Sequence, residues 1–151
     1  NLVLKDIYEM FEIQFAAKGL KLIKEPNANL SPLFVITDEL RLKQILINLI
    51  SNALKFTDDG QIVFGYEIHI KENMIHFYVQ DTGIGIPKSK QETIFQRFIQ
   101  AESKTTKLYG GTGLGLAISL GLIQEFEGKI ELDSKEGIGS TFSFHIPLIT
   151  K

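Results

Sequence analysis

The amino-acid sequence predicts an α+β fold in which helices cover one face of a mixed sheet. The predicted segments follow the order helix, strands, helix, hairpin, helix, hairpin, which is typical of that class. The chain has 151 residues, the size of one ordinary domain. Its 44% hydrophobic and 23% charged residues match the averages of soluble globular proteins. Since the sequence contains no repeat and no linker, we expect residues 1–151 to form a single domain.

The first half of the chain contains two helical patterns with strand-like runs between them. Apolar residues at helical spacing predict a first helix that ends at Gly19, and they are Leu4, Ile7, Phe11 and Phe15. Two strand-like runs follow at residues 20–24 and 33–37, separated by a loop with two prolines. We expect Asp38 to cap a long helix that runs to about Lys55.

A hairpin and a short helix are predicted next. The turn Asp58-Asp59-Gly60 leads into strands at residues 61–70 and 74–80, which residues 71–73 join. Residues 89–98 then predict a short helix.

The last part of the chain predicts a loop, a helix and a second hairpin. Residues 101–111 are polar and lack periodicity, which indicates a mobile loop. A helix is expected at residues 114–127, with Gly128 as its left-handed C-terminal residue. The final hairpin joins strands at residues 129–134 and 141–147.

Composition and charge exclude several classes of function. A net charge of −2 argues against a nucleic-acid groove, which needs clustered Lys and Arg. The absence of cysteine excludes disulfides, thiolate metal sites and cysteine nucleophiles, and it fits a cytoplasmic domain. The apolar runs fall far short of the roughly 18 residues that span a bilayer, and the N-terminus lacks the form of a signal peptide. Because the chain begins inside a helical pattern, we expect it to be part of a longer protein.

The long helix after Asp38 is apolar almost all the way round, apart from one polar stripe. At 100° per residue the stripe falls within a sector of roughly 80°. It contains Arg41, Gln44, Asn48, Asn52 and Lys55. Such a stripe faces either solvent or a site, and solvated faces favour Glu and Lys over asparagine, which is a mediocre helix former. The two asparagines therefore favour a site, and an amide oxygen is a suitable ligand for Mg²⁺.

A carboxylate and two glycines follow the second strand of the first hairpin. Asp81 at the end of this strand is either a turn residue or a residue recruited for binding. Gly83 and Gly85 favour binding, because glycines let the backbone turn tightly and let a flat ligand lie against it. Asp81-Thr82-Gly83 also occurs in aspartic proteases, but that chemistry needs two carboxylates and the chain has one such motif. A protease, which would require a dimer, is therefore ranked far below a nucleotide-binding protein.

A second glycine cluster, at residues 110–115, lies directly before the helix predicted at residues 114–127. The backbone N–H groups of such a loop, together with the N-terminus of the helix, form a cradle for anions. The sequence matches neither a P-loop nor the dinucleotide-binding pattern. Residues 101–111 would then act as a lid over phosphate groups. Lys104 and Lys107 either help to neutralise these phosphates or are ordinary solvated lysines.

The order and spacing of these motifs resemble the catalytic and ATP-binding domain of sensor histidine kinases, the HATPase type within the GHKL superfamily. The resemblance spans essentially the whole chain and implies a two-layer α/β sandwich. The implied sheet is mixed and mostly antiparallel, with about three helices on one face and a mobile ATP lid at about residues 101–112. The matching motifs are the N box NLISNALKFT at residues 48–57, the first glycine box DTGIGIP at 81–87, the F box IFQRF at 94–98, the second glycine box GTGLGLAI at 111–118 and the final motif GSTF at 139–142.

The resemblance also implies roles for individual residues. Asn52 matches the asparagine that coordinates Mg²⁺, and Asn48 matches a second polar contact to the ATP–metal unit. Lys55 matches a basic residue that contacts phosphate, Phe56 an aromatic residue beside the adenine, and Asp81 the carboxylate that accepts the adenine amino N–H. The other positions expected around the nucleotide, with Thr141 as a polar neighbour of Asp81, are Gly83, Gly85, Ile86, Lys107, Gly111, Thr112, Gly113, Leu114, Gly115, Leu116 and Thr141.

One position separates the kinases from related ATPases. The gyrase and chaperone branches carry a Glu four residues before the metal-binding asparagine, as a general base for water. This chain has Asn48 there, and an amide cannot take up a proton. The resemblance therefore implies phosphoryl transfer rather than hydrolysis of ATP, with Asn48 and Lys55 as the predicted catalytic residues. Phe95 and Phe98 of the F box would anchor the near end of the lid.

The resemblance further implies a partner, because the histidine that accepts the phosphoryl group lies on a separate dimerisation domain in this family. His69, His76 and His145 lie in predicted strands, and we expect them to be core or sheet-surface residues. The implied partners are that histidine-bearing domain of the same protein and a response regulator downstream. We expect no nucleic acid as a partner, and contact with a membrane only through other parts of the parent protein. The chain is also expected to be monomeric and cytoplasmic. A nucleotide-gated interaction module without transfer remains the alternative from a different class.

Overall fold

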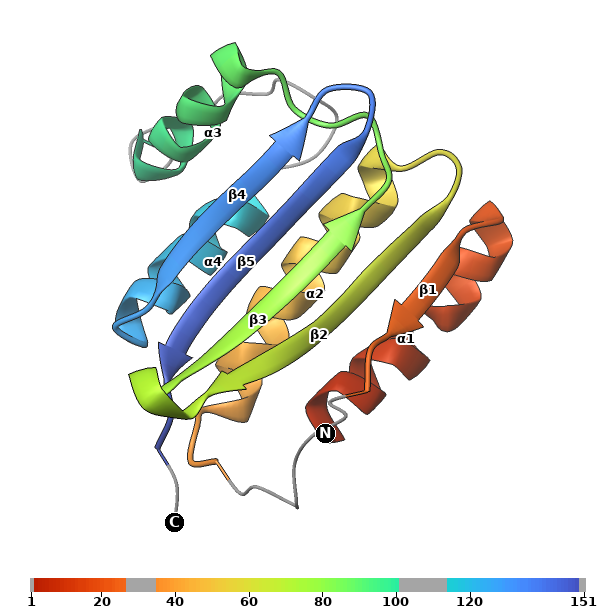
Figure 1. The fold of residues 1–151 in the computed structure, drawn as a ribbon. Helices are drawn as coiled ribbons and strands as arrows, with labels where there is room; N and C mark the ends of the chain where they lie inside the picture. The colour runs from red at the N-terminus through yellow and green to blue at the C-terminus, as the bar shows by residue number, and fades with distance from the viewer. Residues whose placement is uncertain (1, 27–34, 101–113, 150–151) are drawn as a thin grey trace.

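The computed structural model describes residues 2–26, 35–100 and 114–149, without the side chains of residues 95–100 and 114. Its elements are α1 (Leu2–Lys18), β1 (Lys21–Lys24), α2 (Glu39–Phe56), β2 (Gln61–His69), the 3₁₀ helix η1 (Ile70–Glu72), β3 (Met74–Asp81), α3 (Lys88–Gln100), α4 (Leu114–Glu125), β4 (Lys129–Lys135) and β5 (Gly139–Pro147). The strands form one sheet in the order β1-β2-β3-β5-β4, in which β1 is parallel to β2 and the other neighbours are antiparallel. Helices α1, α2 and α4 lie on one side of the sheet, and α3 lies beside the end of β4 (Figure 1). The predicted α+β class is confirmed.

The hydrophobic core lies between the sheet and these helices. The buried side of α2 consists of Leu42, Ile45, Leu46, Leu49, Ile50 and Ala53. The buried residues of α1 are those predicted from their spacing, Leu4, Ile7, Phe11 and Phe15. Alternate residues of β3 and β5 are buried, as expected for an antiparallel sheet covered on one face. None of the helices within the described ranges is both long enough and apolar enough to cross a lipid bilayer.

The strand predicted at residues 33–37 is not formed in the described part of that range. Residues 33 and 34 lie outside the described residues, and Val35 makes only an isolated bridge. Ile36 donates its N–H to the carbonyl of Ile149 at 2.8 Å, beyond the end of β5. Asp38 caps α2 as predicted, because its side chain accepts the N–H of Arg41 at 3.1 Å. The described part of this segment therefore bonds to the chain end after β5 and does not join the ladder of the sheet.

The end of α4 differs from the prediction that Gly128 adopts the left-handed conformation. The left-handed residue is Glu127, with φ 56°. Glu127 donates its N–H to the carbonyl of Gln124 and Gly128 donates to Ile123, both at 2.9 Å, which is the Schellman pattern with Glu127 at the turning position. Gly128 serves close packing instead, since a Cβ there would lie 2.2 Å from the carbonyl oxygen of His145.

The face of the sheet opposite the helices is polar. His76 and His145 lie opposite one another on β3 and β5, at half-buried positions. On the same face Tyr78 extends across its β2 partner Gly65, and its hydroxyl donates to the carboxylate of Glu25. Burial, and then Glu25, raise the pKa of Tyr78, so the phenol remains a donor. A Cβ on Gly65 would lie 2.6 Å from this hydroxyl, so glycine makes the contact possible.

Candidate functional site

The polar stripe predicted on α2 faces α4 along its first half. Arg41 forms an ion pair with Glu125, the last residue of α4. About two turns further along α2, Asn48 donates amide N–H bonds to the carbonyl of Gly115 at 2.9 Å and to the hydroxyl of Ser119 at 3.1 Å. The two helices are therefore antiparallel and joined by polar contacts. Arg41 and Gln44 are exposed, as expected for a face toward solvent, whereas the contact of Asn48 with α4 joins residues 67 and 71 positions apart in the sequence and is not visible from the sequence.

The first turn of α4 therefore lies beside the middle of α2. A Cβ on Gly115 would lie 3.6 Å from Cγ of Asn48, so the two helices approach closely at this point. Backbone N–H groups in the first turn of a helix lack partners within the helix and carry partial positive charge. Asn52 is half-buried and lies one turn, about 6 Å, past Asn48 along α2. The amide side chain of Asn52 thus lies one turn beyond the contact between α2 and the N-terminal end of α4.

Lys55 and Phe56 occupy the last turn of α2, and both side chains are exposed. The Nζ of Lys55 lies 5.2 Å from the centre of the Phe56 ring, within the range of a cation–π interaction. The backbone carbonyl of Phe56 accepts the N–H of Ile84 at 3.2 Å. The end of α2 is therefore joined to the loop that follows Asp81.

Asp81 is the last residue of β3 and lies on the helical side of the sheet, where the residue is only 8% exposed. Its Oδ1 accepts the backbone N–H of Gly83 at 2.8 Å and that of Ser140 at 3.3 Å. Burial raises the pKa of Asp81, and these two hydrogen bonds oppose the rise. Since both bonds use Oδ1, a donor on a ligand would bond to Oδ2.

Thr57 adds a second polar group beside Asp81. It is fully buried, and its Oγ1 has no hydrogen-bond partner among the described residues. A Cβ on Gly83 would lie 2.8 Å from Oγ1 of Thr57 and 2.9 Å from Oδ1 of Asp81, so the two oxygens converge on one point. A buried hydroxyl without a partner costs about 1–3 kcal/mol, which a ligand or a water in contact with it would offset. The pair fits a ligand edge that offers a donor next to an acceptor, as adenine does.

Contacts with the rest of the chain hold the glycine loop after Asp81 on both sides. A Cβ on Gly83 would lie 2.3 Å from the carbonyl oxygen of Phe56. Gly85 has φ 66°, and a Cβ there would lie 2.0 Å from the carbonyl oxygen of Lys135. Ile86 donates its N–H to Oγ of Ser134 at 2.8 Å. These glycines therefore let the loop pack against α2 and the end of β4, contacts that the sequence does not reveal.

Replacement of Gly85 by Ala is expected to destabilise the domain by about 2–4 kcal/mol, because the left-handed backbone and the clash with the Lys135 carbonyl both oppose a Cβ. Urea unfolding followed by circular dichroism measures the loss. Gly121→Ala is the matched control, since no atom lies within 4 Å of a Cβ at this position of α4. The control should gain up to about 1 kcal/mol. Equal stabilities of the two variants would contradict the steric role of Gly85.

The polar neighbour of Asp81 is Ser140, and the prediction of Thr141 was wrong. Asp81 pairs with Ser140 in the β3–β5 ladder. Thr141 therefore points to the open face of the sheet, since successive side chains of a strand alternate between faces. Ser140 is buried, and its Oγ lies 2.8 Å from that of Ser134. Ser140 and Thr57 do not stand out in the sequence, because small hydroxyl residues are common and only the packing of the strands and α2 brings these two to Asp81.

Part of the predicted site lies outside the described residues. This part comprises the predicted lid with Lys107, Gly111, Thr112 and Gly113. The backbone of Leu114 begins α4, whereas its side chain and those of Phe95 and Phe98 are not described. Leu116 is half-buried and packs against the core.

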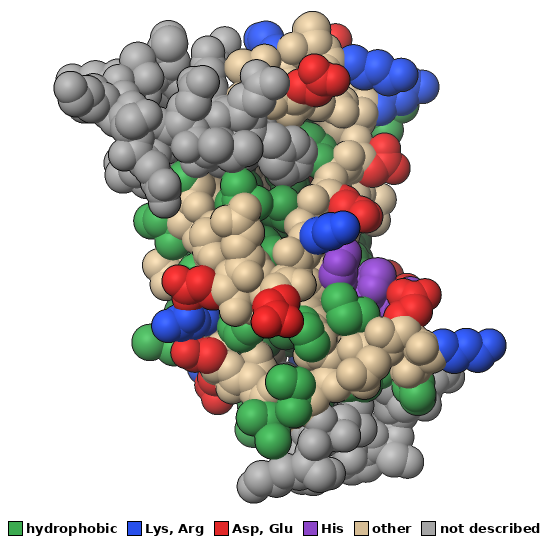
Figure 2. Space-filling model, turned by 90° about the vertical axis from the view of Figure 1, so that its left-hand side faces the viewer, with side chains coloured by type: hydrophobic (Ala, Val, Ile, Leu, Met, Phe, Trp, Pro, Cys, Tyr) green, Lys and Arg blue, Asp and Glu red, His purple; other side chains and the backbone are tan. Residues whose placement is uncertain are grey.

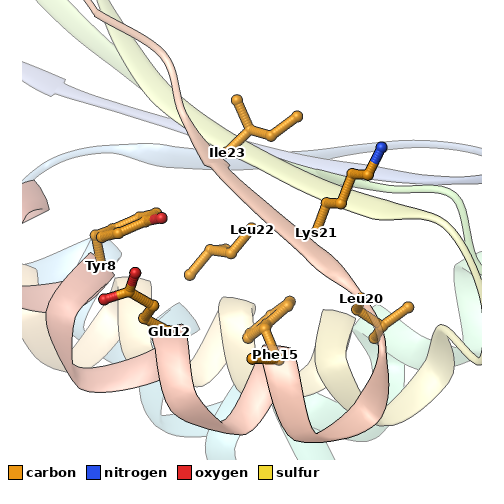
Figure 3. Close-up of a pocket in the computed structure, with 8 residues that line it drawn as sticks. Tyr8, Glu12, Phe15, Leu20, Lys21, Leu22 and Ile23 are labelled. Carbon is orange, nitrogen blue, oxygen red and sulfur yellow. The ribbon is translucent and has the colours of Figure 1, made fainter.

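A cavity of about 390 Å³ lies between α1 and β1 (Figure 3). Its lining is mainly apolar and includes Phe15, Leu20 and Leu22, together with the polar residues Glu12 and Lys21. None of the predicted site residues lines this cavity. It is therefore separate from the group of residues around Asp81 and α4.

Comparison with known proteins defines the class. The family described as histidine kinase-, DNA gyrase B-, and HSP90-like ATPases matches residues 37–150, and the chain belongs to this family. Within it, the chain is a catalytic, ATP-binding domain of the sensor histidine kinase type in the GHKL superfamily. The match confirms the prediction made from the motifs.

Several sensor kinases are similar to this chain. It is 42% identical to the aerobic respiration control sensor protein ArcB of Escherichia coli over 151 residues, which cover 98% of the chain and 19% of that protein. It is 44% identical to the histidine-protein kinase BarA of Escherichia coli over 134 residues, 87% of the chain and 14% of that protein. It is 46% identical to the autoinducer 2 sensor kinase/phosphatase LuxQ of Vibrio vulnificus over 116 residues, 74% of the chain and 14% of that protein. The chain thus spans less than a fifth of the length of these relatives.

Two solved structures share the fold. The full-length kinase ShkA in complex with AMPPNP has a TM-score of 0.84 and 30% identity over 99% of this chain and 30% of that one. The catalytic domain of the histidine kinase ThkA has a TM-score of 0.80 and 30% identity over 99% of this chain and 92% of that one. The predicted sandwich with its mixed sheet is therefore the architecture of histidine kinase ATP-binding domains.

Proposed function

We propose that this domain binds ATP together with Mg²⁺ and presents the γ-phosphoryl group to a histidine on a separate dimerisation and phosphotransfer domain. The observation that carries the proposal is the position of Asp81 and of the first turn of α4 at two ends of one segment of α2. From Asn48, beside α4, to Phe56, beside the loop after Asp81, α2 makes about two turns, roughly 12 Å. This separation suits a ligand with a flat, hydrogen-bonding group at one end and anions at the other.

At the Asp81 end, the buried carboxylate would accept the amino N–H of adenine and the hydroxyl of Thr57 would bond to the adjacent ring nitrogen. A hydrogen bond to a charged acceptor contributes about 1.5–3 kcal/mol. A guanine, which carries an oxygen at the position of the amino group, would leave Asp81 without its donor and would be rejected. The exposed ring of Phe56 would lie beside the base. Gly83, Gly85 and Ile86 would line this end through their backbone.

At the α4 end, Asn52 would coordinate Mg²⁺ through its amide oxygen, since this ion prefers oxygen ligands. Lys55 and the first-turn N–H groups of α4, including that of Gly115, would bind phosphate oxygens. By the resemblance to the family, Lys107, Gly111, Thr112, Gly113, Leu114 and Leu116 belong to the same end.

Asn48 would fix the phosphate end of the site and not act as a base. Its amide donors hold Gly115 and Ser119, so they keep the first turn of α4 against α2. An amide cannot remove a proton from water, and slow hydrolysis of ATP follows. Bound ATP supplies the phosphoryl group, and Asn48 and Lys55 keep the groups around it in place.

The relatives are multidomain sensor kinases, so we propose that residues 1–151 act as one domain of a longer cytoplasmic region. Its partners would be a histidine-bearing domain of the same protein and, downstream, a response regulator. We expect the isolated domain to be monomeric.

Phosphoryl transfer is tested by mixing the chain with Mg²⁺, ATP and the cognate histidine-bearing domain. We expect acid-labile phosphohistidine on that domain, none when its acceptor histidine is replaced by Gln, and hydrolysis of ATP by the chain alone that is slower than transfer. ATP binding without any phosphohistidine, on a domain that a related kinase phosphorylates, would contradict transfer and favour a nucleotide-gated interaction module.

A further inference from the structure

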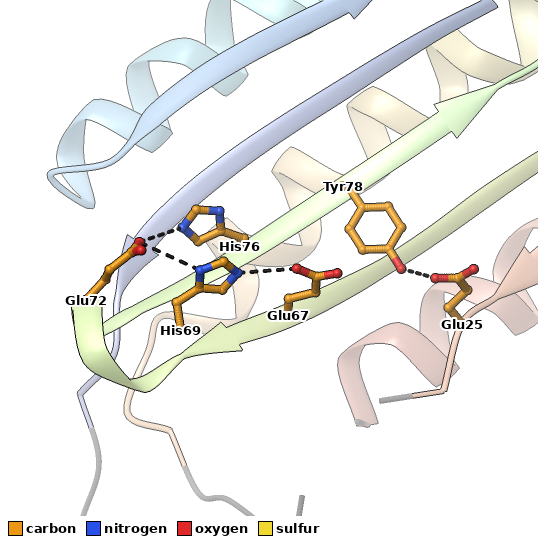
Figure 4. Close-up of polar contacts among 6 residues, drawn as sticks. All are labelled: Glu25, Glu67, His69, Glu72, His76 and Tyr78. Atoms are coloured by element: carbon orange, nitrogen blue, oxygen red, sulfur yellow. Dashed lines mark hydrogen bonds and ion pairs between the residues drawn. The ribbon is translucent and has the colours of Figure 1, made fainter. Parts of the chain in front are cut away.

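We propose that His69, Glu72 and His76 form a binding site for a transition-metal ion of the Zn²⁺ type on the open face of the sheet. His69 ends β2, Glu72 lies in η1 and His76 lies in β3, so one hairpin supplies all three residues. Oε2 of Glu72 lies 3.7 Å from Nδ1 of His69 and 3.8 Å from Nε2 of His76 (Figure 4). The three ligand atoms lie within 4.8 Å of one another.

These separations are close to those of a metal centre. Zn²⁺ binds imidazole nitrogen and carboxylate oxygen at about 2.0–2.2 Å in tetrahedral geometry, which places ligand atoms roughly 3.3–3.5 Å apart. The carboxylate of Glu72 would move toward each ring by about half an ångström. The ligand nitrogens of the two histidines lie within 4.8 Å of one another, and rotation of a histidine side chain would bring them to the separation that a shared ion requires. Two histidines and one glutamate would leave a fourth position for water. Imidazole ligands select Zn²⁺, Cu²⁺ or Ni²⁺ over Mg²⁺.

The backbone of the hairpin holds the ligands in register. The ladder between β2 and β3 extends to the pair of His69 and Met74, directly at the turn. Asn73 closes the turn with φ 55°, and its N–H donates to the carbonyl of Ile70 at 3.2 Å. The rings of His69 and His76 are stacked, with centroids 4.1 Å apart and planes inclined by 8°. Since the lone pair of an imidazole nitrogen lies in the plane of its ring, one of the two stacked rings would turn about its side-chain bonds to reach a shared ion, while the main chain of the hairpin stays in place.

His69 makes the additional contact that metal-binding histidines usually make. Its Nε2 lies 3.3 Å from Oε2 of Glu67 on the same strand (Figure 4). A histidine ligand almost always donates its second ring N–H to a carboxylate, a carbonyl or water, which fixes the tautomer. With its proton on Nε2, His69 presents the lone pair of Nδ1 toward Glu72. This contact is independent of the distances within the cluster.

The cluster is open to solvent and separate from the nucleotide site. Figure 2 shows histidine side chains at the molecular surface with acidic side chains beside them. His69 and His76 are half-buried, so an ion can reach them. His76 precedes Asp81 by five residues on β3, roughly 16 Å, and faces the opposite side of the sheet. The metal inferred here is therefore distinct from the Mg²⁺ proposed at Asn52.

Titration of the chain without an affinity tag with ZnCl₂, followed by isothermal calorimetry in the absence of nucleotide, tests the proposal. We expect one saturable site per chain. His76→Gln and Glu72→Gln should each lower the affinity at least about tenfold, and Glu67→Gln should lower it as the loss of an outer carboxylate does, by about 10-fold or more. Zn²⁺ should also raise the melting temperature of the wild type and not that of His76→Gln, because a ligand stabilises only the state that binds it.

Glu136→Gln is the matched control, since it removes an exposed carboxylate from the β4–β5 turn and should leave Zn²⁺ affinity unchanged. Circular dichroism verifies that each variant is folded. Three results would overturn the proposal: no saturable binding to the wild type, full affinity in His76→Gln and Glu72→Gln, or loss of Zn²⁺ binding in Asn52→Ala. The last result would place the ion at the nucleotide site.

Discussion

Replacement of Asp81 by Asn is expected to lower the affinity for ATP roughly 10- to 150-fold, the equivalent of one hydrogen bond to a charged acceptor. The Asn carbonyl oxygen can still accept the N–H groups of Gly83 and Ser140, so the loop should keep its shape. The amide nitrogen would then face the adenine amino group, and two donors would oppose each other. Calorimetry with ATP and GTP measures both the loss and the weakened preference for adenine.

The same substitution should not destabilise the domain at neutral pH. Burial raises the pKa of Asp81 above its ordinary value, so the folded state holds this proton at pH values where the unfolded state has released it. The contribution of Asp81 to stability therefore falls as pH rises through the unfolded pKa toward the folded pKa, and it stays low above that range. Asp81→Asn removes the unfavourable burial of a charged carboxylate. The stability of the variant relative to the wild type should therefore be higher at pH 7 than at acidic pH. Urea unfolding at several pH values measures the difference.

Asp133→Asn is the matched control, because Asp133 is an exposed carboxylate on β4. It should leave both the affinity for ATP and the pH dependence of stability as in the wild type. An Asp81→Asn variant that binds ATP as tightly as the wild type would refute the adenine contact. A large loss of stability at pH 7 would instead mean that the carboxylate is structural.

The sequence predicts the parts of this fold that depend on local chemistry. The spacing of Leu4, Ile7, Phe11 and Phe15 predicts the buried side of α1, and Asp38 predicts the start of α2. The same information fails where distant segments decide the outcome. The left-handed residue after α4 is Glu127, and Gly128 is required instead by the close approach of the His145 carbonyl, which comes from another strand.

The candidate site also contains residues that the sequence predicts and residues that only the tertiary structure reveals. Asp81 and Asn52 are conspicuous in the sequence because a carboxylate at a strand end and an asparagine in a helix are each unfavourable without a purpose. Thr57 and Ser140 are ordinary in the sequence, and they join the site only when α2, β3 and β5 meet. The group formed by His69, Glu72 and His76 is likewise not visible in the sequence, because only the register of β2 and β3 brings the ring of His69 onto that of His76.

Replacement of Asn52 by Ala is expected to weaken ATP binding in the presence of Mg²⁺ at least about tenfold, as the loss of a metal ligand does. Binding of metal-free ATP should change much less, because the adenine and phosphate contacts remain. The variant should also be as stable as the wild type or more stable, since Ala is a better helix former than Asn by about 0.5–0.7 kcal/mol. Calorimetry with Mg²⁺ and with EDTA, together with urea unfolding, measures these effects.

Asn48→Ala is the comparison that separates a metal ligand from a structural amide on the same helix. Asn48 holds Gly115 and Ser119, so its removal takes a hydrogen-bond partner from the buried hydroxyl of Ser119 and should cost about 1–3 kcal/mol of stability. Nucleotide affinity should then fall with and without Mg²⁺, because the first turn of α4 loses its anchor. If the two variants instead had the same stability and the same metal dependence, the two asparagines would share one role. If Asn52→Ala lost affinity equally with and without Mg²⁺, it would not be the metal ligand.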